Sequence, residues 1–372
     1  MNPSPYKAPF VVHGSDCSYY TGKIEAYLRA KGIDYRLEMF TPLSMRRCVA
    51  NTGVRQIPQV ECPDGSWLLD TTPTIAYLES VCPEPKLSPA DPVVRFVSLL
   101  LEDYADEWLW RPAMHYRWSY RSTAKLMSAW LAEHLSTIPA PAVFKRAYWR
   151  YRQPTWFVRR DGVNASTRAA TEASFLDSLR ALEAIFEIRP FILGETPTEA
   201  DFGFFASMFR HFFSDPAPAR IMRSTAPGVN EWVARMWNLR PDLLADKAPP
   251  TTLPERIEPL LEAVAHIYLP YLAANADAHD RGSKEVTYTV QNVQWREPVK
   301  PYRVRCLAEL HEQHSRLNEG QRAAVAAALA DASAVAILER EPYPSTPPPA
   351  PTLPLRAGSR NGRPLDSWWR RI

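Results

Sequence analysis

The stretch at residues 54–78, VRQIPQVECPDGSWLLDTTPTIAYL, decides how the N-terminal part of the chain folds. Ile57-Pro58 sets a proline at the start of a strand, where a missing backbone N–H is tolerated. Residues 63–66 form a strong turn signal, and residues 67–69 return as the partner strand. Residues 70–73 then open a helix, with a capping side chain and a proline in the first turn. The stretch therefore predicts strand, turn, strand and helix.

Upstream of this stretch the pattern is strand, helix, strand and helix. Residues 10–13 are a short apolar strand, and a loop at residues 14–18 leads into a helix that ends at Gly32. Residues 35–39 predict a second strand and residues 44–49 a short helix. The predicted outline, complete by about residue 83, is a four-stranded mixed sheet with helices.

Downstream the chain turns helical. Residues 82–92 hold four prolines and predict a linker. We expect a long aromatic and acidic helix at residues 93–118, interrupted at Pro112, and an amphipathic helix at residues 167–187.

A further segment follows Pro249-Pro250. Residues 251–340 predict a mostly helical extension, with one strand at residues 286–295 and two helices at residues 304–338. Residues 341–372 are proline-rich and then basic, and predict a flexible or surface-wrapping tail.

The order of elements around Ile57-Pro58 and Asp70-Thr71 resembles that of glutathione S-transferases. The resemblance implies an α+β thioredoxin-like glutathione-binding domain at residues 1–83, followed by an all-α substrate domain at residues 92–248. In that family an aliphatic residue and a cis proline present backbone groups to the cysteinyl part of glutathione. An acidic residue followed by Ser or Thr holds the γ-glutamyl end. Ile57, Pro58, Asp70 and Thr71 occupy these places, and Gln56 is placed to reach the glycyl end.

A second motif supports the resemblance. Thr198 and Asp201 have the spacing of a capping box, in which each side chain bonds the other's free backbone N–H. Preceded by Gly194 and followed by Phe202, the box resembles the motif that opens a core helix in the family's C-terminal domain. Its expected role is structural, and the resemblance extends over residues 8–245.

Two neighbouring residues compete for the catalytic role. Ser18 lies at the start of the first helix, where several transferase classes keep a Ser or Cys that stabilises the glutathione thiolate. Cys17 precedes it, and would instead favour mixed disulfides with glutathione. Asp16 beside Cys17 disfavours a thiolate, so we prefer Ser18 and keep Cys17 as the alternative.

The first long helix of the substrate domain is expected to line the second-substrate pocket. Its candidates are Tyr104, Trp108, Arg111 and His115, although packing in the core explains them equally well. The resemblance also implies a homodimer, with Trp67 near the place where such dimers meet.

Composition excludes several other functions. A formal net charge of +3 is too small to indicate a nucleic-acid partner. The five cysteines include no CxxC pair, and no apolar run has the length of a signal peptide or a membrane span. We therefore expect a cytoplasmic protein with no membrane partner. His311 and His314 lie one helical turn apart without a third ligand, so no metal site is predicted.

Four carboxylates in the first long helix form a different kind of cluster. Glu102, Asp103, Asp106 and Glu107 are spread over two faces of that helix, with no Glu-x-x-His pair among them. We therefore assign them no catalytic role.

Two classes of function follow. The first is a detoxifying glutathione transferase that uses glutathione as co-substrate and conjugates it to small hydrophobic electrophiles. The second is a non-catalytic binding or scaffold protein with the same fold. A thiol-disulfide oxidoreductase that works through Cys17 is a variant of the first class.

Overall fold

The computed structural model describes residues 8–136, 139–348 and 351–357. Up to Val81 it follows the predicted alternation of strands and helices. The elements of this part are β1 (Phe10–Gly14), α1 (Tyr19–Ala30), β2 (Tyr35–Met39), α2 (Pro42–Thr52), β3 (Gln59–Glu61), β4 (Trp67–Leu69) and α3 (Thr71–Val81).

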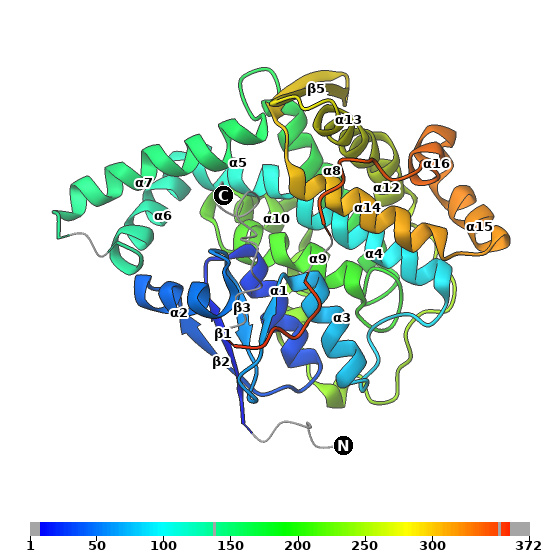
Figure 1. Cartoon of the computed structure of the whole chain (residues 1–372), viewed down its shortest axis with the longest axis horizontal. Coiled ribbons are helices and arrows are strands. Elements are labelled where there is room, and N and C mark those ends of the chain that lie inside the picture. The colour runs from blue at the N-terminus through cyan, green and yellow to red at the C-terminus, as the bar shows by residue number, and fades with distance from the viewer. Residues whose placement is uncertain (1–7, 137–138, 349–350, 358–372) are drawn as a thin grey trace.

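The four strands form one mixed sheet in the order β2-β1-β3-β4. β1 is parallel to β2, whereas β3 runs antiparallel to both β1 and β4. α1 and α3 lie on the face of the sheet that meets the rest of the molecule, and α2 lies on the opposite face (Figure 1). The Ile57–Pro58 peptide bond is cis, as the resemblance implies.

The middle of the chain is all-helical in the part that the structure describes. The helices are α4 (Pro92–Glu107), α5 (Trp110–Ser119), α6 (Arg121–His134), α7 (Ala142–Phe157), α8 (Arg168–Phe186), α9 (Glu199–Ser207), α10 (Pro216–Thr225) and α11 (Pro227–Trp237), with a short turn η3 (Pro241–Leu243) after them. A 3₁₀ turn, η1 (Arg159–Asp161), follows α7, and a π-helical turn, η2 (Met208–Phe213), continues α9.

α9 lies at the centre of the molecule, because every one of its residues is buried between α4 and α1. The capping box predicted at its start is present: the Thr198 backbone N–H donates to Asp201. The Asp201 carboxylate also accepts from the backbone N–H of Ile192 at 3.0 Å and from the Trp232 indole at 3.2 Å. The box therefore joins three segments of the helical core.

The long helix expected at residues 93–118 is two helices, and the break is not at Pro112. α4 ends at Glu107 and α5 begins at Trp110. Pro112 lies in the first turn of α5, where the absent N–H would have no helical acceptor. The proline is thus accommodated by the helix start rather than interrupting a helix.

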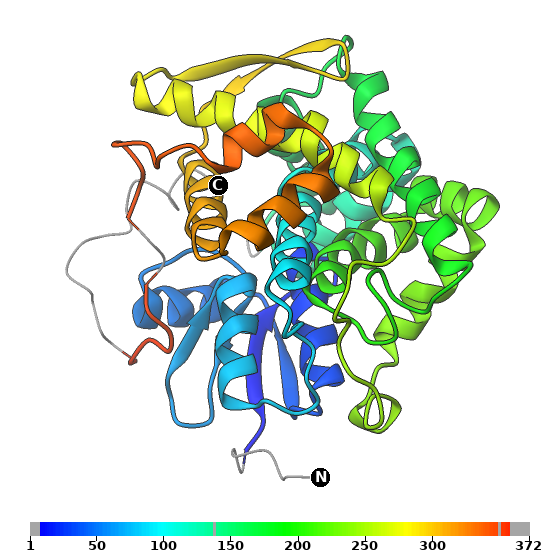
Figure 2. The ribbon, with the colours of Figure 1, turned by 90° about the vertical axis from the view of Figure 1, so that its right-hand side faces the viewer.

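The segment after Pro249-Pro250 folds onto the helical part (Figure 2). The single strand expected at residues 286–295 is wrong: residues 285–298 form a hairpin that turns at Gln291 and Asn292, both with positive φ, as a tight two-residue turn requires. Residues 301–338 hold three helices rather than two. The elements are α12 (Glu258–Ala263), the π-helical turn η4 (Val264–Tyr268), α13 (Leu269–Asp280), β5 (Glu285–Val290), β6 (Val293–Pro298), α14 (Pro301–Ser315), α15 (Glu319–Leu329) and α16 (Ala332–Leu338).

The described part of the tail wraps back onto the N-terminal sheet, one of the two forms expected for it. Leu355 and Trp67 exchange backbone hydrogen bonds, each 2.8 Å long, at the free edge of β4. The Leu355 side chain packs in a small apolar cluster with Cys48, Val54 and Trp67. Figure 2 shows this red segment beside the sheet. The basic end of the tail lies outside the described residues.

Candidate functional site

Three segments meet at one end of the N-terminal sheet, where β1 and β4 end and β3 begins. In the strand register His13 of β1 pairs with Gln59 of β3, and Gln59 pairs with Leu69 of β4. The loop after β1 leads to Ser18, Pro58 directly precedes Gln59, and Asp70 directly follows Leu69. The register therefore brings together the segments that hold the predicted glutathione residues.

Ser18 is the N-cap of α1. Its hydroxyl oxygen accepts the backbone N–H of Thr21 at 3.4 Å, and the residue is half-buried. A hydroxyl has one donor and two acceptor positions, so this bond does not use its proton. Ser18 thus keeps a hydrogen-bond donor at a helix N-terminus, where the helix dipole favours negative charge.

Cys17 is held by its surroundings in the neutral form. Its carbonyl oxygen accepts from the Arg117 guanidinium at 2.8 Å, and its Sγ lies 3.2 Å from the Ser15 hydroxyl. Burial raises the pKa of the Cys17 thiol, and Arg117 and Ser15 offset only part of that effect. A thiol with a raised pKa is a weak nucleophile near neutral pH.

The segment before β3 is fixed by a buried amide. The Gln59 side chain donates to the carbonyl oxygens of Val54 at 2.9 Å and of Gln56 at 3.0 Å. Pro58 is buried, whereas Gln56 and Ile57 are half-buried. The backbone of residues 54–58 is therefore held in place while Gln56 and Ile57 remain partly accessible.

Asp70 has an unusual backbone conformation. Its φ is +61°, which few residues other than glycine adopt, and its carboxylate makes no hydrogen bond to the start of α3. The carboxylate oxygen Oδ2 instead accepts from the Tyr302 hydroxyl at 2.9 Å and lies 3.6 Å from the Arg305 guanidinium. Tyr302 and Arg305 belong to α14, so the extension reaches the predicted γ-glutamyl position. Thr71 beside Asp70 is buried.

A buried lysine lies beside the start of α3, the helix that follows Asp70. Lys23 of α1 forms ion pairs with Asp106 and, at 2.6 Å, with Glu102 of α4. Its ammonium also donates to the Thr72 hydroxyl at 3.2 Å, and that hydroxyl donates to Glu102 at 3.0 Å. Burial opposes the charge, but Asp106 and Glu102 outweigh it and raise the pKa of Lys23. This cluster fixes the start of α3 against α1 and α4.

The two faces of the carboxylate cluster on α4 thus have different partners. Glu102 and Asp106 face Lys23. Asp103 accepts from the Tyr268 hydroxyl at 2.7 Å, and Glu107 pairs with Arg303 at 3.0 Å, both partners being in the extension. The sequence indicated the two faces, but not what each face binds.

The four predicted second-substrate residues lie in the interior. Trp108 donates its indole N–H to Ser174 at 3.1 Å, and buried His115 contacts Glu172 at 2.9 Å. Arg111 is also buried and binds the extension. Tyr104 lines a pocket of about 530 Å³ between α8 and α12, and Ser174, the hydrogen-bond partner of Trp108, lines it too. His115 and Arg111 are not among the residues that line this pocket.

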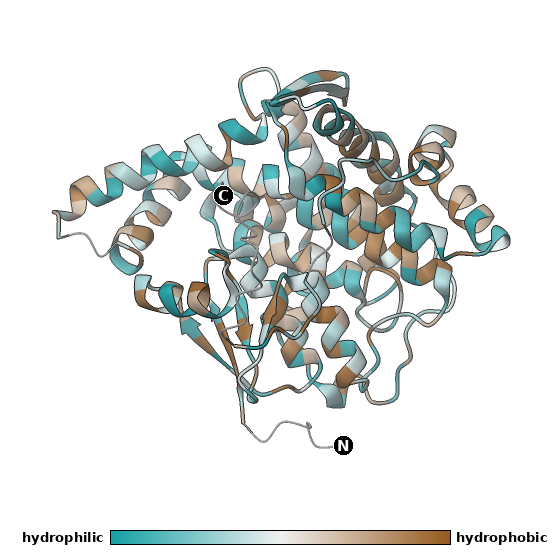
Figure 3. Ribbon diagram, viewed as in Figure 1, coloured by the Kyte–Doolittle hydropathy of each residue, from teal (hydrophilic) through white to brown (hydrophobic). Residues whose placement is uncertain are grey.

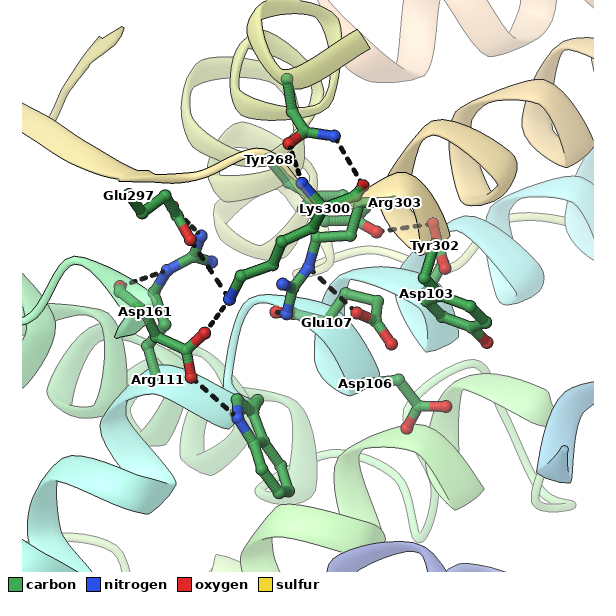
Figure 4. A network of polar contacts seen from close by, with 12 residues as sticks. Asp103, Asp106, Glu107, Arg111, Asp161, Tyr268, Glu297, Lys300, Tyr302 and Arg303 are labelled. Atoms are coloured by element: carbon green, nitrogen blue, oxygen red, sulfur yellow. Dashed lines mark hydrogen bonds and ion pairs between the residues drawn. The ribbon is translucent and has the colours of Figure 1, made fainter. Parts of the chain in front are cut away.

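Arg111 belongs to a buried polar network that joins the helical domain to the extension (Figure 4). Its guanidinium binds Glu297 of β6 at 2.6 Å, and Glu297 also accepts from the Tyr288 hydroxyl at 2.6 Å. Lys300 pairs with Asp161 in the same network. The sequence contained no signal for the pairs of Arg111 with Glu297 and of Lys300 with Asp161, because the partners in each pair lie more than a hundred positions apart.

The described residues contain no group of three or more His, Cys, Asp or Glu side chains that could hold a metal ion. Among the described helices, none is long and apolar enough to cross a membrane.

Comparison with known proteins supports this reading of the fold. Residues 165–235 match the family model for the glutathione S-transferase C-terminal domain. No curated protein matches the sequence.

Solved structures of low identity are also similar. A glutathione S-transferase from Rhodospirillum rubrum is 19% identical with a TM-score of 0.43, over 66% of this chain and 96% of that one. A β-etherase from Sphingobium sp. strain SYK-6 is 19% identical with a TM-score of 0.44, over 64% of this chain and all of that one. A glutathione S-transferase from Methylobacterium radiotolerans, in complex with glutathione sulfonate, is 16% identical with a TM-score of 0.39, over 67% of this chain and 99% of that one.

Residues 165–235 carry the C-terminal domain of the family, and a thioredoxin-like sheet of the order β2-β1-β3-β4 precedes it. The resemblance found in the sequence is thereby confirmed: the chain resembles glutathione S-transferases in the sequence of its C-terminal domain and in its fold.

Proposed function

We propose that the chain binds glutathione at the end of the sheet where β1 and β4 end and β3 begins, and that it transfers glutathione to small hydrophobic electrophiles. One observation carries the proposal: the register of β1, β3 and β4 brings the Ser18 loop, Ile57-Pro58 and Asp70-Thr71 to the same end of the sheet. These segments hold the three kinds of group that glutathione needs, namely a donor to the thiolate, backbone groups beside a cis proline and an acidic partner for an ammonium.

Ser18 is the proposed catalytic residue. Lowering the pKa of a thiol from about 8.5 by two units requires about 2.7 kcal/mol. A hydrogen bond to a charged group contributes about 1.5–3 kcal/mol, and a helix N-terminus about 0.3–1 kcal/mol. The Ser18 hydroxyl at the start of α1 therefore nearly suffices. The raised pKa of Cys17 supports this choice over the thiol-disulfide alternative.

The test compares two neighbouring substitutions. Conjugation of glutathione to a chromogenic aryl chloride is measured for the wild type, Ser18→Ala and Cys17→Ser, with glutathione affinity measured by calorimetry. Ser18→Ala is expected to lower the rate about ten- to a hundred-fold, with affinity within a few-fold, since one hydrogen bond to a charge is lost. Cys17→Ser is expected to change little.

The opposite pattern contradicts the proposed mechanism. If Cys17→Ser abolishes activity and Ser18→Ala does not, the protein is a thiol-disulfide enzyme.

A second candidate is a non-catalytic glutathione-binding scaffold. The contact of α14 with Asp70 favours it, because residues of the extension occupy part of the surface that a substrate needs. Under this reading wild-type protein binds glutathione, Asp70→Ala abolishes binding, and neither Ser18→Ala nor Cys17→Ser changes a measurable rate.

The assembly and the biological role complete the proposal. We expect a homodimer in the cytoplasm with a detoxifying role, as the resemblance implies. The tail residue Leu355 pairs with Trp67 at the edge expected near the dimer contact, so a dimer interface there has to include the tail. Light scattering at micromolar concentration that gives the mass of one chain contradicts the homodimer.

A further inference from the structure

Helix α7 carries much of the exposed apolar surface of the molecule. Together with α6 it projects from the body of the molecule (Figure 1), and none of its residues is buried. Among the described residues, ten large hydrophobic side chains are exposed, and five of them belong to α7. The exposed fraction is 66% for Phe144 and 73% for Tyr151. Single exposed apolar residues are ordinary, but a concentration on one projecting helix marks an interaction surface.

The exposed apolar residues lie on one side of the helix. At roughly 100° per residue, positions 143, 144, 147, 148 and 151 fall within an arc of roughly 140°. They are Val143, Phe144, Ala147, Tyr148 and Tyr151, and together they are called the apolar stripe below. Figure 3 shows brown, hydrophobic residues at the outer end of this helix.

The opposite side of α7 holds the helix to the rest of the molecule. Trp149 and Phe157 are partly buried and pack against the hydrophobic core. Both lie roughly 120–160° around the helix from Tyr151, at the centre of the apolar stripe. The apolar stripe is therefore directed away from the body of the molecule rather than into a contact with it.

Basic side chains border the apolar stripe on both sides. By the same helical spacing Lys145 and Arg152 flank it on one side, and Arg146 and Arg150 on the other. Residues 142–160 contain six basic residues and no acidic one, although the whole chain has 44 basic and 41 acidic residues. The positive charge of this segment is thus far above the average of the chain.

The basic side chains of this segment lack the partners that other surface arginines have. Elsewhere Arg168 and Arg316 each pair with a carboxylate one helical turn away. None of the six basic residues at 142–160 forms an ion pair with an acidic side chain in the part of the chain that the structure describes. The Arg160 guanidinium lies 3.9 Å from the ring centre of Trp156 instead. The positive charge is therefore not neutralised within the described structure and favours an anionic partner.

An apolar stripe between two basic borders is the pattern of a helix that lies in a membrane interface. Tyrosine is also enriched at the level of the lipid headgroups, where its ring is apolar and its hydroxyl is wet. We infer that α7 docks onto an anionic lipid surface, with the apolar stripe among the acyl chains and the basic side chains at the headgroups. The expectation that the chain has no membrane partner rests on the absence of spanning segments, and an interfacial helix does not span the bilayer.

Two other occupants fit the surface less well. A nucleic acid is bound through its phosphates and would place basic residues at the centre of the contact, where α7 has Phe144 and Tyr151. A second copy of the chain in a two-fold contact would place the same patch on both sides, so the basic borders would face each other and repel. An anionic lipid surface matches both the apolar centre and the basic borders.

The test is co-sedimentation of the full chain with vesicles. Binding to vesicles of phosphatidylcholine with phosphatidylserine is expected to exceed binding to phosphatidylcholine alone at least ten-fold, and to weaken with salt. The inference does not depend on glutathione binding, because α7 contains none of the residues predicted to bind glutathione.

One pair of variants tests the apolar stripe at constant charge. Phe144→Ser with Tyr151→Ser is expected to weaken binding to the phosphatidylserine vesicles at least ten-fold, because the apolar contact is lost. The matched control is Leu43→Ser with Leu243→Ser, which removes two exposed apolar side chains outside α7. The control is expected to bind like the wild type.

A second pair tests the basic borders. Each basic side chain near an anionic membrane strengthens binding roughly five-fold, so Arg146→Gln with Arg150→Gln is expected to weaken it about 25-fold. The matched control is Arg220→Gln with Arg223→Gln, which removes the same charge from exposed positions on α10 and should bind within a few-fold of the wild type. Because all eight substituted side chains are exposed, urea midpoints equal to that of the wild type are expected, and they separate loss of binding from unfolding.

Several outcomes overturn the inference. Absence of wild-type binding to the phosphatidylserine vesicles does so, and so does wild-type binding by either α7 double variant. Equal loss in an α7 variant and in its control contradicts a specific role of the helix. Binding of a single-stranded RNA by a chain that ignores the vesicles assigns the basic borders to nucleic acid. A dimer that Phe144→Ser with Tyr151→Ser dissociates, in a chain that ignores the vesicles, assigns the apolar stripe to a second copy.

Discussion

Substitution of Arg111 by leucine tests whether the extension is an integral part of the fold. Arg111 and Glu297 are 0% and 2% exposed, and their side chains are 2.6 Å apart. Burial opposes the charge of Arg111, but Glu297 outweighs it and raises the pKa of the guanidinium. The pair joins α5 to β6, so its loss acts directly on the contact between helical domain and extension.

The expected loss in the free energy of unfolding follows from the buried Glu297 charge that Arg111→Leu leaves without its partner. Removing one partner of a buried ion pair costs about 3–5 kcal/mol, because the other charge stays buried. Glu297 keeps the Tyr288 hydroxyl at 2.6 Å and the Lys300 ammonium at 3.3 Å, so we expect the lower end of this range. The double variant Arg111→Leu with Glu297→Gln removes the unpaired charge and should recover part of the loss.

Urea unfolding followed by tryptophan fluorescence measures this cost, since the guanidinium lies 4.2 Å from the ring centre of Trp108. The matched control is Arg296→Leu on the same hairpin. Arg296 pairs with Glu285, and the two side chains are 72% and 50% exposed, so its loss should cost less than about 1 kcal/mol. If Arg111→Leu costs no more than Arg296→Leu, the extension is not held by this network.

Three further predictions concern other parts of the fold. Burial raises the pKa of Glu199 to about 7, above its unfolded value, so its contribution to stability is full below about pH 4.5 and is lost as the pH rises through 7. Between pH 5 and 8 the free energy of unfolding of Glu199→Gln should therefore fall less steeply with pH than that of the wild type, by at most about 1.4 kcal/mol per pH unit. Urea unfolding at several pH values measures this slope, and an equal slope in the two chains contradicts the prediction. Leu355→Asp should uncover Cys48, which then reacts faster with a thiol reagent as followed by mass spectrometry, and an equal rate refutes the contact. Thr198→Ala should lower the free energy of unfolding by about 1 kcal/mol through loss of the capping box with Asp201, while Thr198→Ser retains it, both measured by urea midpoints.

Local patterns accounted for most of the first 240 residues. The succession of strands and helices along the chain follows from short-range signals such as Ile57-Pro58 and the turn at residues 63–66. The capping box of Thr198 and Asp201 depends on residues three positions apart, which is the range over which sequence patterns are reliable.

Long-range contacts could not be predicted. Nothing in the sequence near Asp70 indicates Tyr302, because the two meet only once the extension has packed. Arg111 illustrates the same limit: its type and helical position suited a substrate pocket, and only the placement of Glu297 shows that it is a structural residue. The hairpin turn at Gln291 and Asn292 was missed because it lacks the glycine that usually marks such turns.

The backbone pairing of Leu355 with Trp67 has a consequence for how the chain is made. The outer edge of β4 presents unpaired hydrogen-bonding groups until a partner covers it, and such an edge is a template for pairing with other chains. Its partner, Leu355, comes much later in the sequence, so during synthesis the edge of the N-terminal sheet stays uncovered until Leu355 has been made. Removal of the segment around Leu355 is therefore also a change to the first domain, and aggregation of chains that lack this segment is the first effect to look for.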